Sequence, residues 1–256
     1  MNPHLTSRPP VRIGLIIPPA WFDFTAAELR TLLPQGSEVM TAQMRFSTGF
    51  GYELNEVRDA ASEVAASAKA LAETGADLIL QIGTPFSTIH GWEGGQALER
   101  NIEEDIGTPF EMMGVSVVRR LKQLGLRSVG VNTVYYDTAW TAHYTNFLGD
   151  AGVEVRYAGN FSDQGVGASI GAIAACHEHV DDAFLIQSVE TVCALANEPD
   201  GIVIAGIANQ QLNLAPVMEL AVNRPVLGYY AAFARCLERL DIPLPTEFGA
   251  VLADNA

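Results

Sequence analysis

The stretch ADLILQIGTPFSTIHG, residues 76–91, decides the fold class that the sequence predicts. The run LILQI at 78–82 has the length and character of a buried strand, and it stops at Gly83. A small turn follows, made of Thr84, Pro85, Phe86 and Ser87. Ligands of open α/β sheets bind just beyond the carboxyl ends of the strands. The residues of this turn are therefore the first candidates for a binding site.

Length and charge limit the classes of protein to which the chain can belong. Its 256 residues are enough for one large or two modest α/β domains. The net charge of −15 argues against nucleic acid and anionic membranes as partners, because both require a basic surface. A small carboxylic acid is compatible with this charge, since a few backbone donors can hold it locally. The sequence is also compatible with a homo-oligomer.

The amino-terminal segment and the length of the apolar runs indicate the cellular location. The amino-terminal MNPHLTSRPP is polar and proline-rich, unlike a signal peptide. The apolar runs are interrupted well before about 18 residues, the length that a transmembrane helix needs. We therefore expect a cytoplasmic protein.

Strand and helix signals alternate along the chain. Apolar runs predict strands at 11–18, 76–83, 128–135, 154–161 and 200–209, and a short one near 108–113. Between them, amphipathic patterns predict helices at about 55–74, 93–105, 114–124, 138–150 and 182–197. This alternation of apolar strands with helices is typical of parallel sheets covered by helices on both faces.

An internal repeat divides the chain into two similar α/β halves. Adding 116 to the residue number carries Gly14 onto Gly130, Pro109 onto Pro225, and RRLKQLGL (119–126) onto RCLERLDI (235–242). Gly83 reaches Gly206 at a shift of 123. We predict two pseudo-symmetric parallel-sheet halves, 11–112 and 128–229, with the site in the cleft between them. The closing helices, 113–127 and 230–242, cross over or pack back, and the carboxyl-terminal tail packs back with the second.

The first half contributes two strand ends to this predicted cleft. Pro18 and Pro19 make a stiff loop after the first strand, and Trp21 or Phe22 just beyond could contact an apolar part of a ligand. After Gly83, which allows close approach to the backbone, Thr84 and Ser87 each offer a hydroxyl and an N–H. Carboxylate oxygens suit such a group of donors, although helix capping by the same residues is the alternative.

The second half contributes two more strand ends. Tyr135 and Tyr136 follow the strand at 128–135, and alternation along a strand predicts that at most one of them faces a ligand. In AGIANQ (205–210), the backbone N–H groups of Gly206, Ile207 and Ala208 are further donors, and the Asn209 side chain adds one more.

Other motifs do not support a bound cofactor. GVGASIG (165–171) has the wrong glycine spacing for a dinucleotide fingerprint, and HEH (177–179) places its imidazoles on different sides of a helix. Cys176, Cys193 and Cys236 lack CxxC spacing, which is typical of reduced, buried thiols. We expect neither a metal nor an organic cofactor.

The four strand ends together resemble those of the aspartate/glutamate racemase superfamily. IIPPA, GTPFS, NTVYYD and DGIVIAG are most similar to the branch of arylmalonate decarboxylase and maleate cis-trans isomerase. The resemblance implies two pseudo-symmetric halves, no cofactor, and a hole of donors that holds a carboxylate and the enediolate formed when CO2 leaves. It assigns to that hole Thr84, Tyr135 and the N–H groups near Gly206 and Ile207.

Two departures from this family set the chain apart. Gly83 and Gly206 stand where the superfamily's racemases and isomerases carry cysteines, and Pro85 replaces a second hydroxyl donor. Thiol-based racemisation and thiol addition to maleate are therefore not expected. The proton donor would be Tyr135, Tyr136, His90 or a bound water.

Three functions follow as hypotheses. The first is a cofactor-independent lyase, a decarboxylase of a small malonate-like acid. The second is an isomerase or racemase of a small mono- or dicarboxylate with non-cysteine acid and base groups. The third is a non-catalytic protein that binds a small acid on the same scaffold.

Overall fold

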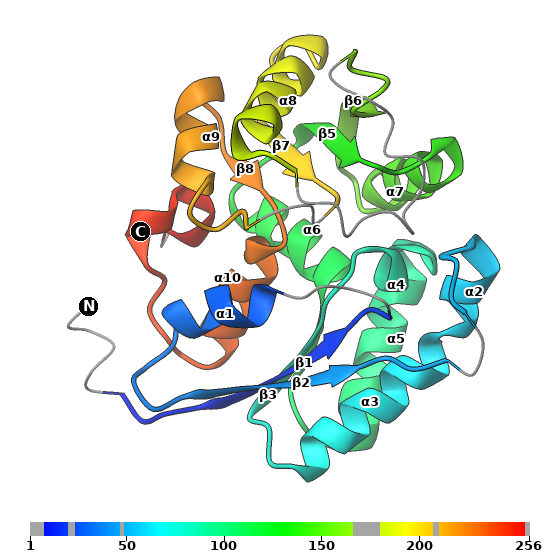
Figure 1. Ribbon diagram of the computed structural model, residues 1–256, viewed down its shortest axis with the longest axis vertical. Helices are drawn as coiled ribbons and strands as arrows, with labels where there is room; N and C mark the ends of the chain where they lie inside the picture. Colours follow the sequence, from blue (N-terminus) through cyan, green and yellow to red (C-terminus); the bar gives the residue numbers. More distant parts are fainter. Residues whose placement is uncertain (1–7, 20–23, 47–48, 166–179, 207–209, 254–256) are drawn as a thin grey trace.

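The computed structural model contains two four-stranded parallel sheets, one above the other, with helices around them (Figure 1). It describes residues 8–19, 24–46, 49–165, 180–206 and 210–253. The first sheet has the order β2-β1-β3-β4 and the second the order β6-β5-β7-β8. Their strands are β1 (Arg12–Ile17), β2 (Glu38–Gln43), β3 (Leu78–Gln81), β4 (Phe110–Met112), β5 (Ser128–Val134), β6 (Glu154–Asn160), β7 (Gly201–Ile204) and β8 (Val226–Leu227). The predicted α/β fold class is confirmed.

The shared strand order is the structural form of the sequence repeat. β1 and β5 begin at residues 12 and 128, and β2 and β6 begin at 38 and 154, which reproduces the shift of 116. β3 and β7 begin at 78 and 201, which reproduces the shift of 123. We keep the division into halves at 11–112 and 128–229, with their closing helices, as a proposal.

The repeated glycine of the first strand in each half allows a helix to pack closely. A Cβ atom built on Gly14 would lie 3.0 Å from Cδ1 of Leu71, on the helix that covers β1. A Cβ atom built on Gly130 would lie 2.9 Å from Cγ1 of Val192, on the helix that covers β5. The identity found at the shift of 116 therefore has a packing reason that is the same in both sheets.

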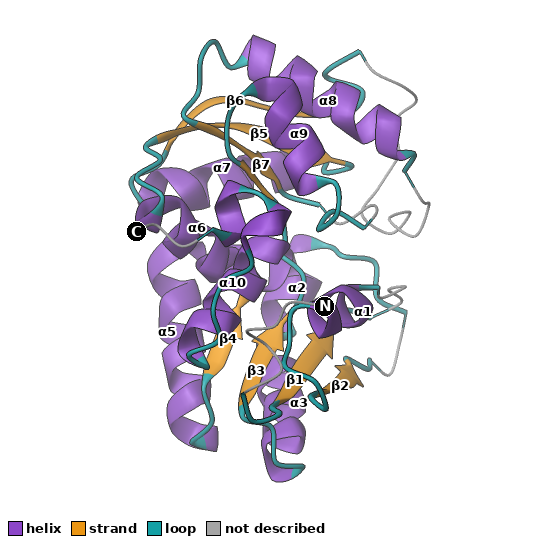
Figure 2. Ribbon diagram, turned by 90° about the vertical axis from the view of Figure 1, so that its left-hand side faces the viewer, coloured by secondary structure: helices purple, strands orange, loops and turns teal. Residues whose placement is uncertain are grey.

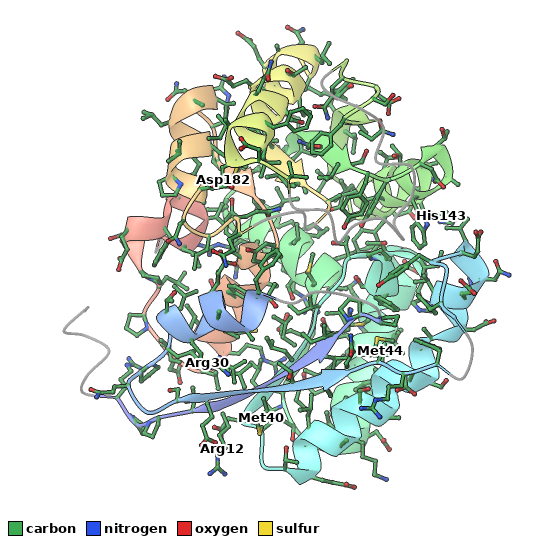
Figure 3. The ribbon with its side chains drawn as sticks, in the orientation of Figure 1. Arg12, Arg30, Met40, Met44, His143 and Asp182 are labelled. Carbon is green, nitrogen blue, oxygen red and sulfur yellow. The ribbon has the colours of Figure 1, made fainter. Side chains whose placement is uncertain are left out.

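A repeated aspartate fixes the start of the same strands. Arg12 N donates to Asp77 Oδ2 at 2.7 Å, and the N–H groups of Arg127 and Ser128 donate to Asp200 Oδ2 at 2.9 Å. These backbone donors hold the pKa of Asp200 below its usual value. Figure 3 shows Arg12 at the outer end of the first sheet and Met44 at the opposite end, where β2 has finished.

Helices cover both sheets (Figure 2). The helix predicted at 55–74 is two helices that meet at Ala60, and the turn after Gly83 continues as the short helix α4. The helices are α1 (Thr25–Thr31), α2 (Leu54–Asp59), α3 (Ala61–Glu73), α4 (Pro85–Thr88), α5 (Gly91–Ile106), α6 (Met113–Gln123), α7 (Thr138–Asp150), α8 (Asp182–Leu195), α9 (Ala215–Val222) and α10 (Tyr230–Arg239), with 3-10 turns η3 (Thr246–Phe248) and η4 (Ala250–Leu252).

The helix that follows the second sheet packs onto the first. α10 contacts β3 and β4 as well as α6, and the side chains of Tyr230, Phe233 and Leu237 are fully buried there. α7 of the second half packs in turn against α4 and α5 of the first. These exchanges of helices join the two halves and bring their strand ends toward each other.

Candidate active site

The strand ends of the two halves meet at the carbonyl oxygen of Ala205, directly after β7. Thr84 Oγ1 donates to this oxygen across 3.1 Å from the first half. The hydroxyl of Tyr136, after β5, donates to the same oxygen across 3.0 Å. The structure therefore brings together three of the four strand ends that the sequence selected, at one buried backbone group.

Gly83 is a close-packed corner of this region. Its φ is +104°, a conformation that side chains rarely adopt. A Cβ atom there would lie 2.9 Å from Cγ of Pro18 and 3.1 Å from Cδ2 of Phe86. Pro18, at the first strand end, thus packs directly against the glycine of the second. Pro85 is the first residue of α4, where its missing N–H is harmless.

Ser87 supports the turn from within. Its hydroxyl donates to the Thr84 carbonyl at 3.1 Å and accepts from Gly114 N at 3.1 Å, and the residue is fully buried. Thr88 donates to the same carbonyl at 3.1 Å. These bonds hold the carbonyl of Thr84, while its hydroxyl is held separately by the Ala205 carbonyl. A ligand contact by Ser87 itself stays a prediction.

Both tyrosines reach the end of β7. A Cβ atom built on Gly206 would lie 3.1 Å from Cζ of Tyr135, and Tyr136 donates to Ala205 as described above. The alternation of a strand does not separate them because β5 ends at Val134, whose φ is +55°. This value is unusual for a β-branched residue, and such strain is concentrated at functional sites. Asn132 Oδ1 accepts from Val134 N at 3.0 Å and stabilises the bend.

A cluster of aromatic side chains extends from the turn toward the surface. The ring of Phe86 lies 6.1 Å from that of Phe50, nearly parallel, and Phe50 lies 4.4 Å from Phe46. Tyr52 contacts both Phe50 and Phe86, and its hydroxyl donates to the carbonyl of Pro19 at 2.7 Å. The predicted site residues Pro19 and Phe86 are thus linked by one buried tyrosine.

Some predicted residues lie outside the described residues. They are the donors Ile207, Ala208 and Asn209, the aromatic residues Trp21 and Phe22, and Cys176 with both histidines of HEH. Gly206, which precedes the first of them, is described and buried.

The remaining titratable candidates are one histidine and two thiols, all of them on helices or at a helix start. His90 precedes α5, and burial together with the nearby Arg58 lowers its pKa. Cys193 and Cys236 are free thiols on α8 and α10, and burial raises the pKa of both. Neither described thiol is positioned to replace the cysteines that Gly83 and Gly206 omit.

Two buried glutamines near the site were not predicted from the sequence. Gln81 Nε2 donates to the carbonyl of Gly83 at 3.1 Å, and Gln211 Nε2 donates to the carbonyl of Gly206 at 3.1 Å. Gln81 is the single polar residue of the run LILQI, and this interruption of an apolar strand was a usable signal. No comparable pattern marks Gln211.

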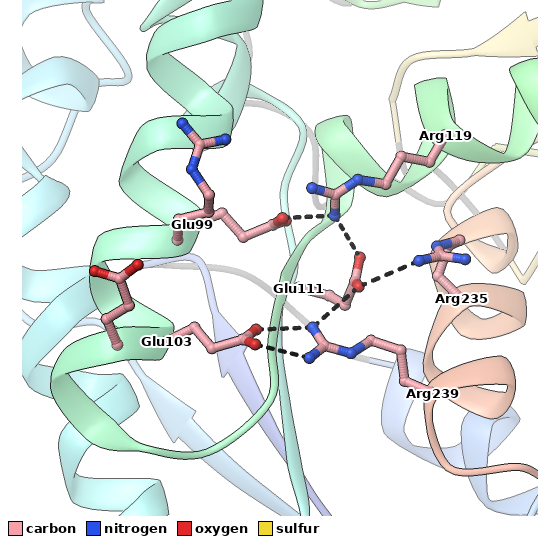
Figure 4. A pocket seen from close by; sticks show the side chains of 8 residues that line it. Glu99, Glu103, Glu111, Arg119, Arg235 and Arg239 are labelled. Atoms are coloured by element: carbon pink, nitrogen blue, oxygen red, sulfur yellow. Dashed lines mark hydrogen bonds and ion pairs between the residues drawn. The ribbon is translucent and has the colours of Figure 1, made fainter.

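A charged cavity of about 450 Å³ lies among α5, β4, α6 and α10 (Figure 4). Glu111 is buried at its centre, with Arg119 at 3.2 Å and Arg239 at 3.4 Å. Glu103 binds Arg239 through both oxygens at 2.8 Å. Because the carboxylates and arginines that line this cavity pair with one another, we interpret them as a structural ion network.

The described ranges contain neither a metal-ligand cluster nor a membrane-spanning segment. No group of three or more histidine, cysteine, aspartate or glutamate side chains in them could hold a metal ion. No helix among them is long and apolar enough to cross a bilayer.

Comparison with known proteins identifies the family. The family model described as arylmalonate decarboxylase matches residues 13–241. The arylmalonate decarboxylase of Bordetella bronchiseptica is 26% identical over 220 residues, 84% of each chain.

Solved structures share the fold. Unliganded arylmalonate decarboxylase has a TM-score of 0.75 at 22% identity, covering 95% of this chain and 99% of its own. The maleate isomerase Iso from Pseudomonas putida S16 has a TM-score of 0.77 at 19% identity, covering 96% and 99%. The predicted resemblance is confirmed, and the chain belongs to the arylmalonate decarboxylase family.

Proposed function

We propose that this protein is a cofactor-independent decarboxylase of a small malonate-like acid. The observation that carries the proposal is the meeting of Thr84 and Tyr136 at the Ala205 carbonyl, with the ring of Tyr135 beside Gly206. Hydroxyls from both halves are thereby concentrated at the ends of β5 and β7. This is the arrangement that a carboxylate and its enediolate require.

The chemistry follows from these donors. One carboxylate of the substrate lies among hydroxyl and backbone donors, while the bond from the α-carbon to the other carboxylate breaks. The electron pair of that bond passes into the retained carboxyl group, giving an enediolate, and CO2 leaves. Hydroxyls such as those of Thr84 and Tyr136 can rotate from a carbonyl toward the more strongly accepting enediolate. Preorganised donors of this kind are often the largest catalytic contribution.

A proton then adds to the α-carbon and completes the reaction. We assign its delivery to Tyr135, because Gly83 and Gly206 have no side chain to supply it. The aromatic group of Phe46, Phe50 and Phe86 beside Gly83 favours an apolar, and in particular an aryl, substituent on the acid.

The experiment is to incubate the purified protein with phenylmalonate in D2O, without added metal and with a chelator. We expect CO2 and phenylacetate that carries one deuterium at the α-carbon, followed by NMR. Thr84→Ala should lower kcat/KM by about a hundredfold, the effect of removing one donor to a developing oxyanion. Tyr135→Phe should lower it by about a hundredfold or more, the usual contribution of a general acid. Ser116→Ala, a buried hydroxyl in the ion network, is the matched control and should retain activity.

The same assay, extended to a chiral acid, to maleate and to a panel of substituted malonates, distinguishes the alternatives. An isomerase or racemase would place deuterium at the α-carbon of a chiral acid, or convert maleate, with no release of CO2. A binding protein would bind these acids without turnover. Either result, in place of CO2 release across a panel of substituted malonates, would contradict the decarboxylase proposal.

A further inference from the structure

The strand that leads to the two tyrosines of the site carries a fully buried amide. Asn132 lies in β5, two residues before the strand ends, and its backbone carbonyl accepts from Ala205 N at 2.9 Å. In the first sheet, the shift of 116 places Ile16 at the same position, where it is also fully buried. An apolar residue therefore suffices for the strand itself, and burying an amide there has a cost that its hydrogen bonds must offset.

The amide of Asn132 belongs to a closed ring of hydrogen bonds. Its Nδ2 donates to Ser188 Oγ on α8 at 2.7 Å, and the Ser188 hydroxyl donates in turn to Gln164 Oε1. Gln164 Nε2 donates back to Asn132 Oδ1 at 3.3 Å and to the carbonyl of Gly159 at 2.9 Å. Because each donor of the ring faces an acceptor, the ring fixes which way the amide of Asn132 is turned. Its oxygen is thereby directed toward the end of β5.

This oxygen is the acceptor at the strained residue of the bend. Val134 N donates to Asn132 Oδ1 at 3.0 Å, the side-chain-to-backbone pattern of an Asx turn. The register of β5 with β6 shifts between Asn132 and Val134, which is typical of a bulge. The φ of Val134 is +55°, a conformation that a β-branched residue adopts only where its surroundings impose it. The bond from Asn132 supplies part of that constraint.

The backbone after the bend is held at its other end as well. The carbonyl of Tyr136 accepts from Asn160 Nδ2 at 2.8 Å, so the two asparagines hold the segment of Tyr135 and Tyr136 from either side. A regular strand would turn consecutive tyrosines to opposite faces, whereas here both reach the end of β7. The bend at Val134 is therefore what brings both rings to the site.

We propose that Asn132 is a positioning residue, because its amide imposes the bend that directs Tyr135 and Tyr136 toward the substrate. It acts through the backbone of Val134. Displacing a catalytic group by about 1 Å can lower a rate by about a hundredfold, so the constraint has a large effect to offer. A buried network whose members are all bonded gives the rigidity that such placement requires. This role rests on the proposed decarboxylation, in which the two tyrosines supply a donor and the proton.

The test uses the full-length enzyme with phenylmalonate as the probe. Asn132→Ala removes the acceptor for Val134 N and should lower kcat by about tenfold to a hundredfold, with a smaller change in KM, because the tyrosines act mainly in the transition state. Asn132→Asp keeps an oxygen at the same place, whether the carboxyl group is ionised or protonated. It should therefore restore kcat to within about threefold of wild type.

Stability gives a readout that a merely structural role would not produce. Asn132→Asp places a carboxyl group in a fully buried position and should lower the urea midpoint, as Asn132→Ala does. Val129→Ala, at a fully buried position of the same strand, is the matched control. It should lower the midpoint by leaving a cavity but keep kcat within about twofold. The value of kcat should thus follow the acceptor oxygen and not the midpoint.

A further variant covers the case in which Asn132→Ala does not fold. Asn132→Ser offers a hydroxyl, which accepts from a backbone N–H two residues on more weakly than an amide does. Its kcat should lie between those of wild type and of a variant without an acceptor, at about a tenth of the wild-type value or somewhat above. A kcat equal to that of wild type would overturn the positioning role.

The outcomes separate this inference from the proposed function. With active wild-type enzyme, an unchanged kcat in Asn132→Ala, or an equal loss in Asn132→Ala and Asn132→Asp, overturns the inference alone. A wild type that binds phenylmalonate without releasing CO2 contradicts decarboxylation alone. In that case calorimetric affinity decides: weaker binding by Asn132→Ala than by Asn132→Asp supports the positioning role, and equal binding by both overturns it. A wild type that neither binds nor turns over phenylmalonate overturns both.

Discussion

At the scale of single residues, the two glycines of the site differ in the physical reason why a larger side chain is excluded. Gly83 has a φ of +104° and the ring of Pro18 within 2.9 Å of a built Cβ atom. Gly206 has Cζ of Tyr135 and Cβ of Val134 at 3.1 Å from its built Cβ atom. A side chain at 83 therefore requires both a strained backbone and movement of a proline ring. At 206 it requires a shift of a few tenths of an ångström.

This difference predicts unequal costs for alanine at the two positions. Gly83→Ala should lower the free energy of unfolding by about 2 kcal/mol or more, because alanine resists a positive φ. Gly206→Ala should cost about 1 kcal/mol, less than Gly83→Ala, since its conflict is a pair of contacts at 3.1 Å and involves no positive φ. Urea unfolding of the two variants measures both values. An equal or larger loss for Gly206→Ala would contradict the geometry described here.

At the scale of elements, the ion network among α5, β4, α6 and α10 joins the closing helix of the chain to the first sheet (Figure 4). Glu99 Oε2 accepts from Met112 N at 2.8 Å, and the side chain of Glu99 also binds Arg119. Burial, together with the nearby Glu111, raises the pKa of Glu99 to about 7. Two buried carboxylates thus share the arginines of this network.

The raised pKa predicts how Glu99 affects stability. The native state binds the proton more tightly than the unfolded chain, whose glutamate pKa is 4.5. Between about pH 4.5 and pH 7 the stability contributed by Glu99 therefore falls as pH rises, and the cost is complete above pH 7. A shift of this size corresponds to about 3 kcal/mol.

Glu99→Gln removes this titration. Its free energy of unfolding, measured in urea at pH values from 4 to 8, should rise relative to wild type by about 3 kcal/mol across the range. A difference between the two proteins that stays constant with pH would show that Glu99 is not the titrating group.

At the scale of the whole molecule, contacts between the halves are numerous enough to predict a single unfolding transition. Trp140 Nε1 on α7 donates to the carbonyl of Tyr52 at 3.0 Å, and the ring of Trp92 on α5 lies 5.6 Å from that of Phe147 on α7. α10, which carries the fully buried Phe233, contacts α6 and the strands β3 and β4 of the first sheet. Neither half can lose its partner without exposing apolar surface.

Tryptophan fluorescence, which follows the junction, and far-UV circular dichroism, which follows all helices, should therefore give the same urea midpoint. Phe233→Ala should shift both midpoints together and cost about 3–5 kcal/mol, the usual loss for a buried phenylalanine. Separate midpoints by the two methods would mean that the halves unfold independently.

Much of the fold could be predicted because it depends on neighbours in the sequence. Apolar strands, helical periodicity and the shifts of 116 and 123 indicated two parallel sheets, and the observed strand starts follow those shifts. The break of the helix at Ala60 was not predicted, since the apolar face that holds Val57 and Val64 continues through it. Strand β7 also ends earlier than its apolar pattern suggested.

The sequence by itself determined the fold class, the family resemblance and the glycines at the strand ends, because each of these is written in residues close together along the chain. Only the tertiary structure decided that Thr84 and Tyr136 share the Ala205 carbonyl and that Gln211 turns back to Gly206. The direction of a side chain beyond a strand depends on single backbone angles, such as the φ of +55° at Val134. Its partner depends on packing between segments that are far apart in the sequence.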